Sequence, residues 1–391
     1  QDLFVCTSQV LERMTSSLDK YDAPALVKLG LSLQSDGRLQ EAAVVMHRAC
    51  KKAPDAFDAH LFLGHLLCDL GRPRDAVGPY KQAAAISPSN HQAHLGLAYA
   101  FQDLQDHQSA CNSYESAVEC AGLQGKEKAD CFFNLGNSLS QLGSKSRAEA
   151  AFKESIKIEE SAEACNNLGD LLWELGEVDQ ALQYLGRCCE LNPESSTFQQ
   201  NRLMLLNYIP SIDASEVFEM HRAWGDQCIR KIGACWNDWS SLSLDPAKPL
   251  RVAYISPDFF RHSTCYFAQC LVEHHERKMF DVFLYSNTLR EDETTEFFKS
   301  AVSDQRWRCI VGMCSEDVAK RIRDDQIDIL VDLAGHSANN RLDVMALKPC
   351  PVQFTWCGYQ NTTGLRSIDY LITDEHVNPV ELNQQFTETL A

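Results

Sequence analysis

Apolar residues recur with two different periodicities along this 391-residue chain. From about Asp22 to Pro193, apolar and small residues recur three and four positions apart, with short polar turns between the segments. From Leu250 onwards, short apolar runs alternate with amphipathic stretches at helical spacing. The pattern predicts an array of paired helices followed by a domain of alternating strands and helices.

The helical region repeats itself. A Leu-Gly pair recurs at Leu29, Leu63, Leu135 and Leu168. Each pair is followed seven residues later by a glycine and five residues after that by an alanine, and a fifth copy fits around Leu97, where Gln105 replaces the glycine. A period of 33 or 34 residues resembles tetratricopeptide repeats. After an N-terminal helical segment at 1–21, we expect five repeats over residues 22–195, stacked so that their concave face can bind an extended partner.

Amide side chains follow one helical face of the last two repeats. They are Asn134 and Asn137 in one repeat and Asn167, with the carboxylate Asp170, in the next. A primary amide donates and accepts at once, so such a row can hydrogen-bond a peptide backbone whatever its side chains. The equivalent positions of the first three repeats hold Lys28, Phe62 and Gly96. We therefore predict a short acceptor-peptide groove, with a solvated polar face as the alternative.

Residues 196–249 are expected to connect the array to the second domain. Helices are predicted over Thr197–Tyr208 and Asp213–Lys231, with Asp213 or Ser215 as the cap of the second helix, and a linker follows. His221 and Trp224 fall on the apolar stripe of that helix, so we expect them to pack rather than react.

Residues 250–391 are predicted to form a Rossmann-like lobe, giving the chain an α plus α/β fold class. The expected strands are Leu250–Ser256, Asp281–Asn287, Trp307–Val311, Asp328–Ala334, Val352–Cys357 and Ile368–Thr373. The expected helices between them are Cys265–Glu276, Glu291–Val302, Ser315–Asp325 and Asn340–Leu347. This alternation predicts a parallel sheet with helices on both faces.

Charge and cysteine content exclude several classes of function. A net charge of −18 argues against nucleic acid or an anionic membrane as the main partner, because both attract positive charge. No apolar run is long enough to suggest a membrane span. The 17 cysteines are dispersed and form no C-x-x-C pair, so we expect reduced, mostly buried thiols and no metal site. An intracellular protein is predicted.

Polar residues gather where the predicted strands end, and parallel strands place such loops on one edge of a sheet. The first loop carries Asp258 and His262. The later loops carry His336, Ser337, Asn339, Asn340, Cys357, Gly358, Tyr359, Thr362 and Thr363. An imidazole beside loop amides could support group transfer from a phosphate-activated donor. In the alternative reading, His262 caps its helix and Asp258 satisfies loop amides.

At these loops the chain resembles a known family. The segments RVAYISPDFFRHST and DLAGHSANNRLDVMALKPCPVQFTWCGYQNTTG, preceded by tetratricopeptide repeats, are similar to the protein O-GlcNAc transferase family, glycosyltransferase family 41, and most to its SPINDLY-like branch. The resemblance implies the N-terminal half of a GT-B fold and sugar transfer to Ser or Thr of nuclear and cytosolic proteins. It implies that His262, with Asp258, is catalytic and that the later loops bind the donor.

The resemblance also carries expectations about partners. It implies a nucleotide-sugar co-substrate, either UDP-GlcNAc or GDP-fucose, no metal or other cofactor, and a protein acceptor presented by the repeats. His336 with Asn339 and Asn340 is the SPINDLY-like form. A homodimer formed through the repeats is left open. Because the resemblance stops at Ala391, before a second lobe with a catalytic lysine, we expect little or no transfer by these residues alone. The alternative function is a protein-binding scaffold with an incomplete transferase lobe.

Overall fold

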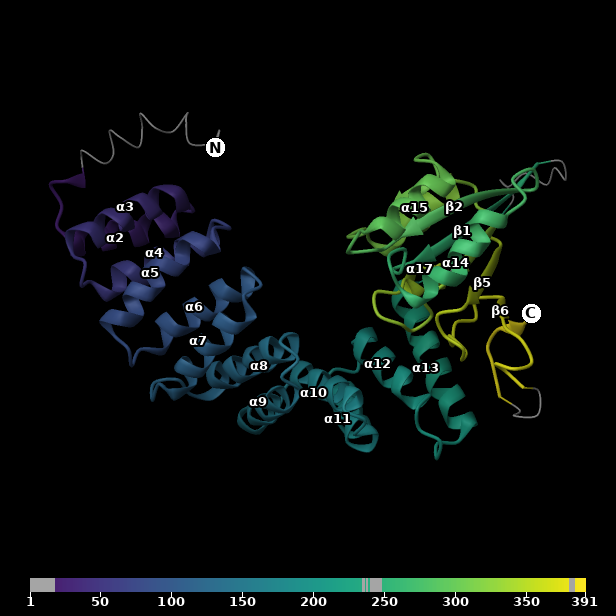
Figure 1. Ribbon diagram of the computed structural model, residues 1–391, viewed down its shortest axis with the longest axis horizontal. Helices are drawn as coiled ribbons and strands as arrows, with labels where there is room; N and C mark the ends of the chain where they lie inside the picture. The colour runs from purple at the N-terminus through teal and green to yellow at the C-terminus, as the bar shows by residue number, and fades with distance from the viewer. Residues whose placement is uncertain (1–17, 234–235, 237, 240–247, 380–383) are drawn as a thin grey trace. The chain divides into compact units, whose positions relative to one another are not determined.

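The computed structural model describes residues 18–233, 236, 238–239, 248–379 and 384–391 (Figure 1). Most of the predicted N-terminal segment and most of the predicted linker lie outside these residues. The chain divides into two compact units, Gln1–Leu191 and Asn192–Ala391. Each unit is described by itself below.

The first unit contains the five predicted helix pairs. They are α2 (Ala23–Ser35) with α3 (Leu39–Lys52), α4 (Phe57–Asp69) with α5 (Pro73–Ile86), α6 (His91–Asp103) with α7 (His107–Glu119), α8 (Gly125–Gln141) with α9 (Lys145–Ile158), and α10 (Ala162–Glu174) with α11 (Val178–Leu191). Figure 1 shows the pairs following one another in chain order. The tetratricopeptide prediction is therefore confirmed.

Glycines in the first helix of each pair let a large side chain approach closely. The ring of Tyr80 lies between Gly64 and Gly96, where an added Cβ would come within 2.5 Å and 2.3 Å of it. Gly136 makes the same room for Phe152. The glycine of the repeating Leu-Gly pair is therefore explained by close packing of a large side chain from another helix. At the turn of the third repeat, Gln105 adopts the left-handed backbone conformation that glycine holds in the others, with φ of 59°.

The second unit begins with α12 (Ser196–Leu206) and α13 (Ala214–Ile232), close to the predicted helices. Asp213 is the cap of α13 and accepts a hydrogen bond from the Ser215 amide at 2.8 Å. A seven-stranded sheet follows, and all its paired strands are parallel. Its strands are β1 (Leu250–Ser256), β2 (Phe280–Ser286), β3 (Trp307–Cys309), β4 (Ile329–Asp332), β5 (Val352–Trp356), β6 (Tyr370–Ile372) and β7 (Thr389–Leu390). The six predicted strands are confirmed, and β7 was not predicted.

Helices cover both faces of this sheet. They are α14 (Ser263–His274), α15 (Glu293–Val302), α16 (Ser315–Asp324) and α17 (Leu342–Ala346). Helices α14 and α15 share an apolar core with Val252, Val282 and Val331 on one face. On the other face, the buried Gln353 side chain donates to the Met345 carbonyl of α17 at 2.9 Å. Both faces of a parallel sheet are normally covered in this way.

The strand order β3-β2-β1-β4-β5-β6-β7 reverses direction between β1 and β4. The chain moves outward from β1 to β3, returns to pair β4 against β1, and then moves outward on the other side. In open α/β sheets, ligands bind outside the carboxyl ends of the strands at such a switch point. The topology therefore indicates the ends of β1 and β4 as the candidate site.

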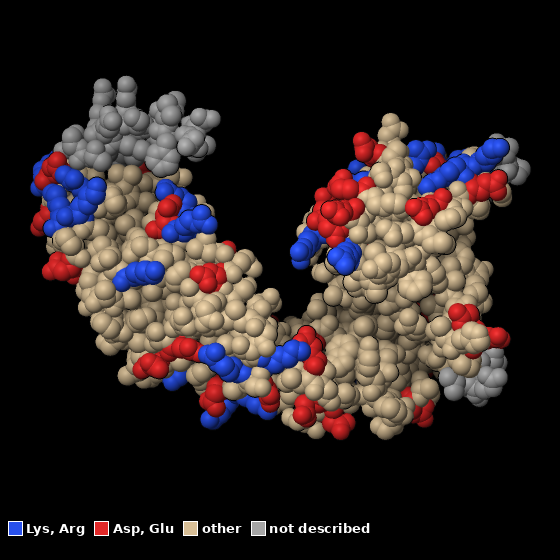
Figure 2. All heavy atoms as spheres, in the orientation of Figure 1, with Lys and Arg blue, Asp and Glu red and all other residues tan. Residues whose placement is uncertain are grey.

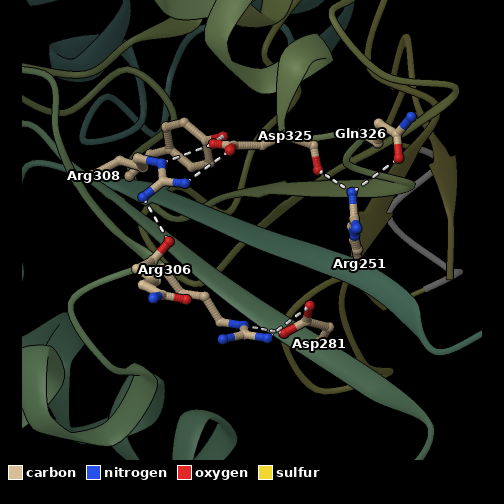
Figure 3. A network of polar contacts seen from close by, with 8 residues as sticks. Arg251, Asp281, Arg306, Arg308, Asp325 and Gln326 are labelled. Atoms are coloured by element: carbon tan, nitrogen blue, oxygen red, sulfur yellow. Dashed lines mark hydrogen bonds and ion pairs between the residues drawn. The ribbon is translucent and has the colours of Figure 1, made fainter.

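A network of ion pairs stabilises the sheet away from that site (Figure 3). Asp325, which caps α16, accepts two hydrogen bonds of 2.8 Å from the guanidinium of Arg308 in β3. Arg251 donates to the Asp325 carbonyl at 2.8 Å, and Arg306 pairs with Asp281 at the start of β2. Bidentate Arg–carboxylate pairs are the geometrically specific kind. Through Asp325 the network joins the end of α16 to β1 and β3, and the Arg306–Asp281 pair connects the segment before β3 to β2.

The surface shows charges of both signs. On the face seen in Figure 2, acidic and basic side chains form small mixed clusters, and no broad basic patch is visible. Among the described residues, no helix is long and apolar enough to cross a membrane. The cysteines in this described part are free thiols, and more of them are buried than exposed, as predicted.

Candidate active site at the switch point of the sheet

The loops after β1, β2 and β4 line a hollow of about 420 Å³ at the carboxyl edge of the sheet. Its lining residues are Pro257, Asp258, Phe260, His262, Asn287, Leu289, Arg290, Ser337, Ala338 and Asn339. The hollow lies where the strand order reverses, so the predicted meeting of the first and fourth strand-end loops is confirmed. The loop after β2 was not part of the prediction.

Asp258 and His262 lie side by side in the first of these loops. The His262 Nδ1 atom is 3.7 Å from the Asp258 Oδ2 atom. The His262 side chain is 41% exposed, whereas that of Asp258 is 13% exposed. Burial raises the pKa of the Asp258 carboxyl, and the neighbouring His262 acts in the opposite direction. The arrangement presents an accessible imidazole next to a mostly buried carboxyl group.

His262 is also the N-cap residue of α14. Its Nδ1 accepts a hydrogen bond from the Thr264 amide at 3.4 Å and lies 3.2 Å from the Thr264 hydroxyl. Nδ1 must be unprotonated to accept, so in this neutral tautomer Nε2 carries the hydrogen. Within the described residues Nε2 has no hydrogen-bond partner, so it can donate to a substrate oxygen. Nε2 could act as a base only in the other neutral tautomer, in which the ring hydrogen is on Nδ1 and faces Asp258.

A buried carboxyl group, Asp332 at the end of β4, supports the loops from beneath. It accepts hydrogen bonds from the Gly335 amide at 2.7 Å and from the Thr355 hydroxyl at 2.8 Å. Burial raises the pKa of Asp332 to about 6, against the lowering effect of these hydrogen bonds. Asp332 was predicted only as part of a strand, because an aspartate in an apolar run carries no local sign of its partners.

The loop after β4 presents only some of its predicted residues to the hollow. Ser337 and Asn339 line it, and Asn339 adopts a left-handed conformation with φ of 58°. His336 is 2% exposed and points inward, with its Nε2 atom 2.9 Å from the Thr363 carbonyl. Asn340 donates to the Gln200 side chain at 2.8 Å and to the Ser337 carbonyl at 2.7 Å. His336 and Asn340 are thus engaged within the protein.

The loop after β5 lies next to this site but turns most of its polar groups inward. Burial raises the pKa of the Cys357 thiol, and the Asp258 carboxylate raises it further. Gly358 has no room for a side chain, because a Cβ there would lie 2.2 Å from the Leu333 carbonyl oxygen. Tyr359, Thr362 and Thr363 are buried.

Glu388, just before β7, explains why the two threonines are buried. Its carboxylate accepts hydrogen bonds from the Thr362 hydroxyl at 2.6 Å, from the Thr363 amide at 2.8 Å, and from the Thr363 hydroxyl. Glu388 itself is 5% exposed. Sequence reasoning missed it because a glutamate in a polar terminal stretch looks like a surface residue.

Asn287 and Arg290, after β2, were also missed. The Asn287 side chain donates to the Asn339 carbonyl at 2.9 Å and so ties the loop after β2 to the loop after β4. Arg290 lines the hollow and brings a positive charge to it. The strand-end rule applied to β2, as it was applied to β1, would have singled out this loop.

In the repeat unit, the predicted polar side chains make hydrogen bonds within and between neighbouring repeats. Asn167 donates to the Asn137 side chain in the preceding repeat at 2.8 Å. Asp170 accepts from Asn166 at 3.1 Å, and burial raises the pKa of Asp170 to about 6. Asn134 is hydrogen-bonded to Tyr99 of the repeat before it. Neighbouring repeats are therefore linked through this polar row.

Residues 219–391 match glycosyl transferase family 41. Residues 129–161 and 162–195, and the overlapping segments 27–90 and 63–123, match tetratricopeptide repeats. Among the described residues, no group of three or more His, Cys, Asp or Glu side chains is arranged to hold a metal ion.

Proteins with similar sequences match part of this chain. A probable UDP-N-acetylglucosamine–peptide N-acetylglucosaminyltransferase SPINDLY of Arabidopsis thaliana is 41% identical over 203 residues, 51% of this chain and 22% of the relative. A UDP-N-acetylglucosamine–peptide N-acetylglucosaminyltransferase of Caenorhabditis elegans is 32% identical over 152 residues, 38% of this chain and 13% of the relative. The alignment thus spans about a fifth or less of these relatives.

A solved structure resembles more of the chain. A single-site mutant of the Thermobaculum terrenum O-GlcNAc transferase is 27% identical, with a TM-score of 0.66 over 77% of this chain and 56% of that one. This similarity agrees with a repeat array followed by a GT-B-like N-terminal lobe in the present chain. With its tetratricopeptide repeats and this parallel-sheet lobe, the chain is similar to the SPINDLY-like members of glycosyl transferase family 41, whose family model matches residues 219–391.

Proposed function

We propose that this protein is a protein O-glycosyltransferase that moves a sugar from a nucleotide-sugar to Ser or Thr side chains. The observation that carries the proposal is the hollow at the switch point. There His262 lies with its Nδ1 atom 3.7 Å from Asp258 Oδ2, and its Nε2 atom has no hydrogen-bond partner among the described residues. The names of the relatives support UDP-GlcNAc as the donor. GDP-fucose remains the second donor to test, and metal-independent transfer is part of the proposal.

The chemistry assigns each group a role. Transfer forms a bond between the acceptor hydroxyl oxygen and the anomeric carbon, while the bond from that carbon to the donor phosphate breaks. The electron pair of the broken bond goes to the leaving nucleoside diphosphate, and the proton of the acceptor hydroxyl passes to an oxygen of that diphosphate. A hydrogen bond from His262 Nε2 can orient the acceptor or stabilise the leaving oxygen, and Asn339 offers hydrogen-bonding groups to the donor.

The amide row of the repeats supplies the acceptor site in this proposal. Asn134, Asn137 and Asn167 can pair with the backbone of an extended protein segment. Backbone pairing is independent of sequence, so it suits an enzyme with several protein substrates. We propose that such acceptors, rather than nucleic acid or membranes, are the partners and that they are cytosolic or nuclear.

The test is a His262→Ala variant of the protein expressed with its complete natural reading frame. We expect transfer from labelled UDP-GlcNAc to a Ser/Thr acceptor protein to fall by about 100-fold or more, the usual contribution of a positioned catalytic side chain. Parallel reactions with GDP-fucose identify the donor. His274→Ala, an exposed histidine later in the same helix, is the matched control and should retain full activity.

Retention of full transfer by His262→Ala would remove this residue from the mechanism. Absence of transfer from both donors by the wild-type protein, with acceptor binding retained, would support the scaffold function instead.

A further inference from the structure

A buried group of aromatic and polar side chains lies behind the hollow. This histidine cluster consists of His221 and Trp224 from α13, His336 after β4, and Tyr359 after β5. The His336 ring centroid lies 5.3 Å from that of His221, 4.5 Å from that of Trp224, and 5.1 Å from that of Tyr359. All four residues are at most 5% exposed. Three separate chain segments therefore meet in this cluster.

The Tyr359 hydroxyl is the hydrogen-bonding centre of the cluster. It lies 2.6 Å from His221 Nε2 and accepts from the Asn207 side chain at 2.8 Å. His221 Nδ1 is 2.7 Å from the Val217 carbonyl and must donate to it, which leaves Nε2 as an acceptor. The Tyr359 hydroxyl consequently donates to His221. Burial lowers the pKa of His221 to about 4, which keeps this neutral tautomer in place at neutral pH.

Tyr359 also contacts the loop that faces the hollow. A Cβ at Gly335 would lie 2.2 Å from the Tyr359 Cβ, and Gly335 adopts φ of 56°, so the loop turns directly over Tyr359. His336 follows, with its Nε2 atom against the Thr363 carbonyl. Ser337 and Asn339 then emerge into the hollow. A continuous set of contacts runs from α12 and α13, through Tyr359, to two residues of the candidate site.

We infer that Tyr359 is a positioning residue for transfer: its hydroxyl, held by His221 and Asn207, orders the 335–340 loop rather than touching the donor. This inference rests on the proposed function and revises the expectation that Tyr359 and His336 bind the donor. The buried hydroxyl has three protein partners within 3.4 Å, namely Asn207, His221 and the Leu203 carbonyl. Its one hydrogen is used within the protein, and Tyr359 is only 5% exposed, so a ligand does not reach this oxygen.

The test compares Tyr359→Phe with Tyr285→Phe. Both changes remove one buried hydroxyl and keep the ring. The Tyr285 hydroxyl donates a hydrogen bond to the Asp325 side chain at 2.6 Å, away from the hollow. At a temperature where each variant is fully folded, we expect Tyr359→Phe to lower kcat about 10- to 100-fold, as small misplacements of reacting groups do. Tyr285→Phe should lower Tm and leave kcat unchanged. A His221→Gln, Tyr359→Phe double variant should be no slower than Tyr359→Phe alone, because both remove the same bond.

Hydrogen exchange on this chain gives an answer that needs no transferase activity. Peptides that cover residues 335–340 should exchange faster in Tyr359→Phe than in wild type or in Tyr285→Phe. Unchanged exchange there, or a lowered Tm with unchanged kcat, would overturn the positioning role. If wild type transfers neither sugar, the proposed function fails, and the exchange result still decides whether Tyr359 orders the loop.

Discussion

Burial, more than hydrogen bonding, decides the protonation states of the ionisable groups behind the site. The pKa of His221 is lowered to about 4, and burial also lowers that of His336 well below its ordinary value. Asp332 responds in the opposite sense, since burial raises the pKa of an acid to about 6. For all three groups, folding shifts the pKa in the direction that favours the neutral form.

These shifts predict a pH dependence of stability. His221 binds a proton less tightly in the folded protein than in the unfolded chain. The unfolding free energy that it contributes is therefore fully present above pH 6.5 and is lost as the pH falls from 6.5 towards 4. The whole shift corresponds to about 3 kcal/mol. Asp332 acts oppositely, with stability lost as the pH rises from 3.8 towards 6. Comparing wild type with a single-site variant separates the two effects.

We expect His221→Gln to lose less unfolding free energy than wild type when the pH drops from 7 to 5. Guanidinium unfolding followed by tryptophan fluorescence measures this, because five of the six tryptophans lie in the second unit. Equal losses in the two proteins would contradict the assignment of His221 as a buried neutral residue.

At the scale of elements, α13 packs against the site loops through its backbone. An added Cβ at Gly225 would lie 1.9 Å from the Gly364 carbonyl oxygen, and one at Gly364 would lie 2.0 Å from the His221 carbonyl oxygen. The helix and the loop after β5 therefore approach as closely as two backbones can. Helix α13, outside the sheet, is in this way part of the structure that holds the loop after β5.

Gly225→Ala is expected to lower the unfolding free energy by about 3 kcal/mol, because the loop must move to admit the methyl group. Gly186→Ala, in α11, is the control: no atom lies within 4 Å of its added Cβ, so it should stabilise its unit by about 0.5 kcal/mol or more. Chemical unfolding followed by circular dichroism compares them. A neutral Gly225→Ala would show that the helix can separate from the loop at little cost.

At the scale of the whole molecule, the proposed function assigns a different role to each of the two compact units. The repeats would bind the protein acceptor, and the parallel-sheet lobe would supply His262 and the donor-side loops. A change in the amide row should therefore affect acceptor kinetics without affecting the donor.

The double variant Asn137→Ala, Asn167→Ala tests this division. Two lost hydrogen bonds, each worth about 1 kcal/mol, should raise KM for an unfolded protein acceptor about tenfold or more and leave kcat and the donor KM unchanged. Asn112→Ala removes an exposed amide of α7 outside the row and serves as the control. An unchanged acceptor KM in the double variant would indicate a solvated polar face.

The sequence by itself determined the elements and their order. Repeats could be predicted because the same glycine must admit a large side chain in each helix pair, as Gly64 does for Tyr80, and this contact recurs with the period. Strands could be predicted because a parallel sheet covered on both faces requires continuous apolar runs. The two-residue strand β7 lacks such a run and was missed.

The tertiary structure alone decided which polar residues face the hollow. Sequence reasoning treated all polar groups at the strand ends alike, yet His262, Ser337 and Asn339 line the hollow while His336 and Tyr359 point into the protein. Thr362 and Thr363 are likewise turned inward by Glu388, 25 or 26 residues away. The direction of a loop side chain depends on partners distant in the chain, such as His221, which lies 138 residues from Tyr359. No local pattern encodes those contacts, because they exist only once the segments pack together.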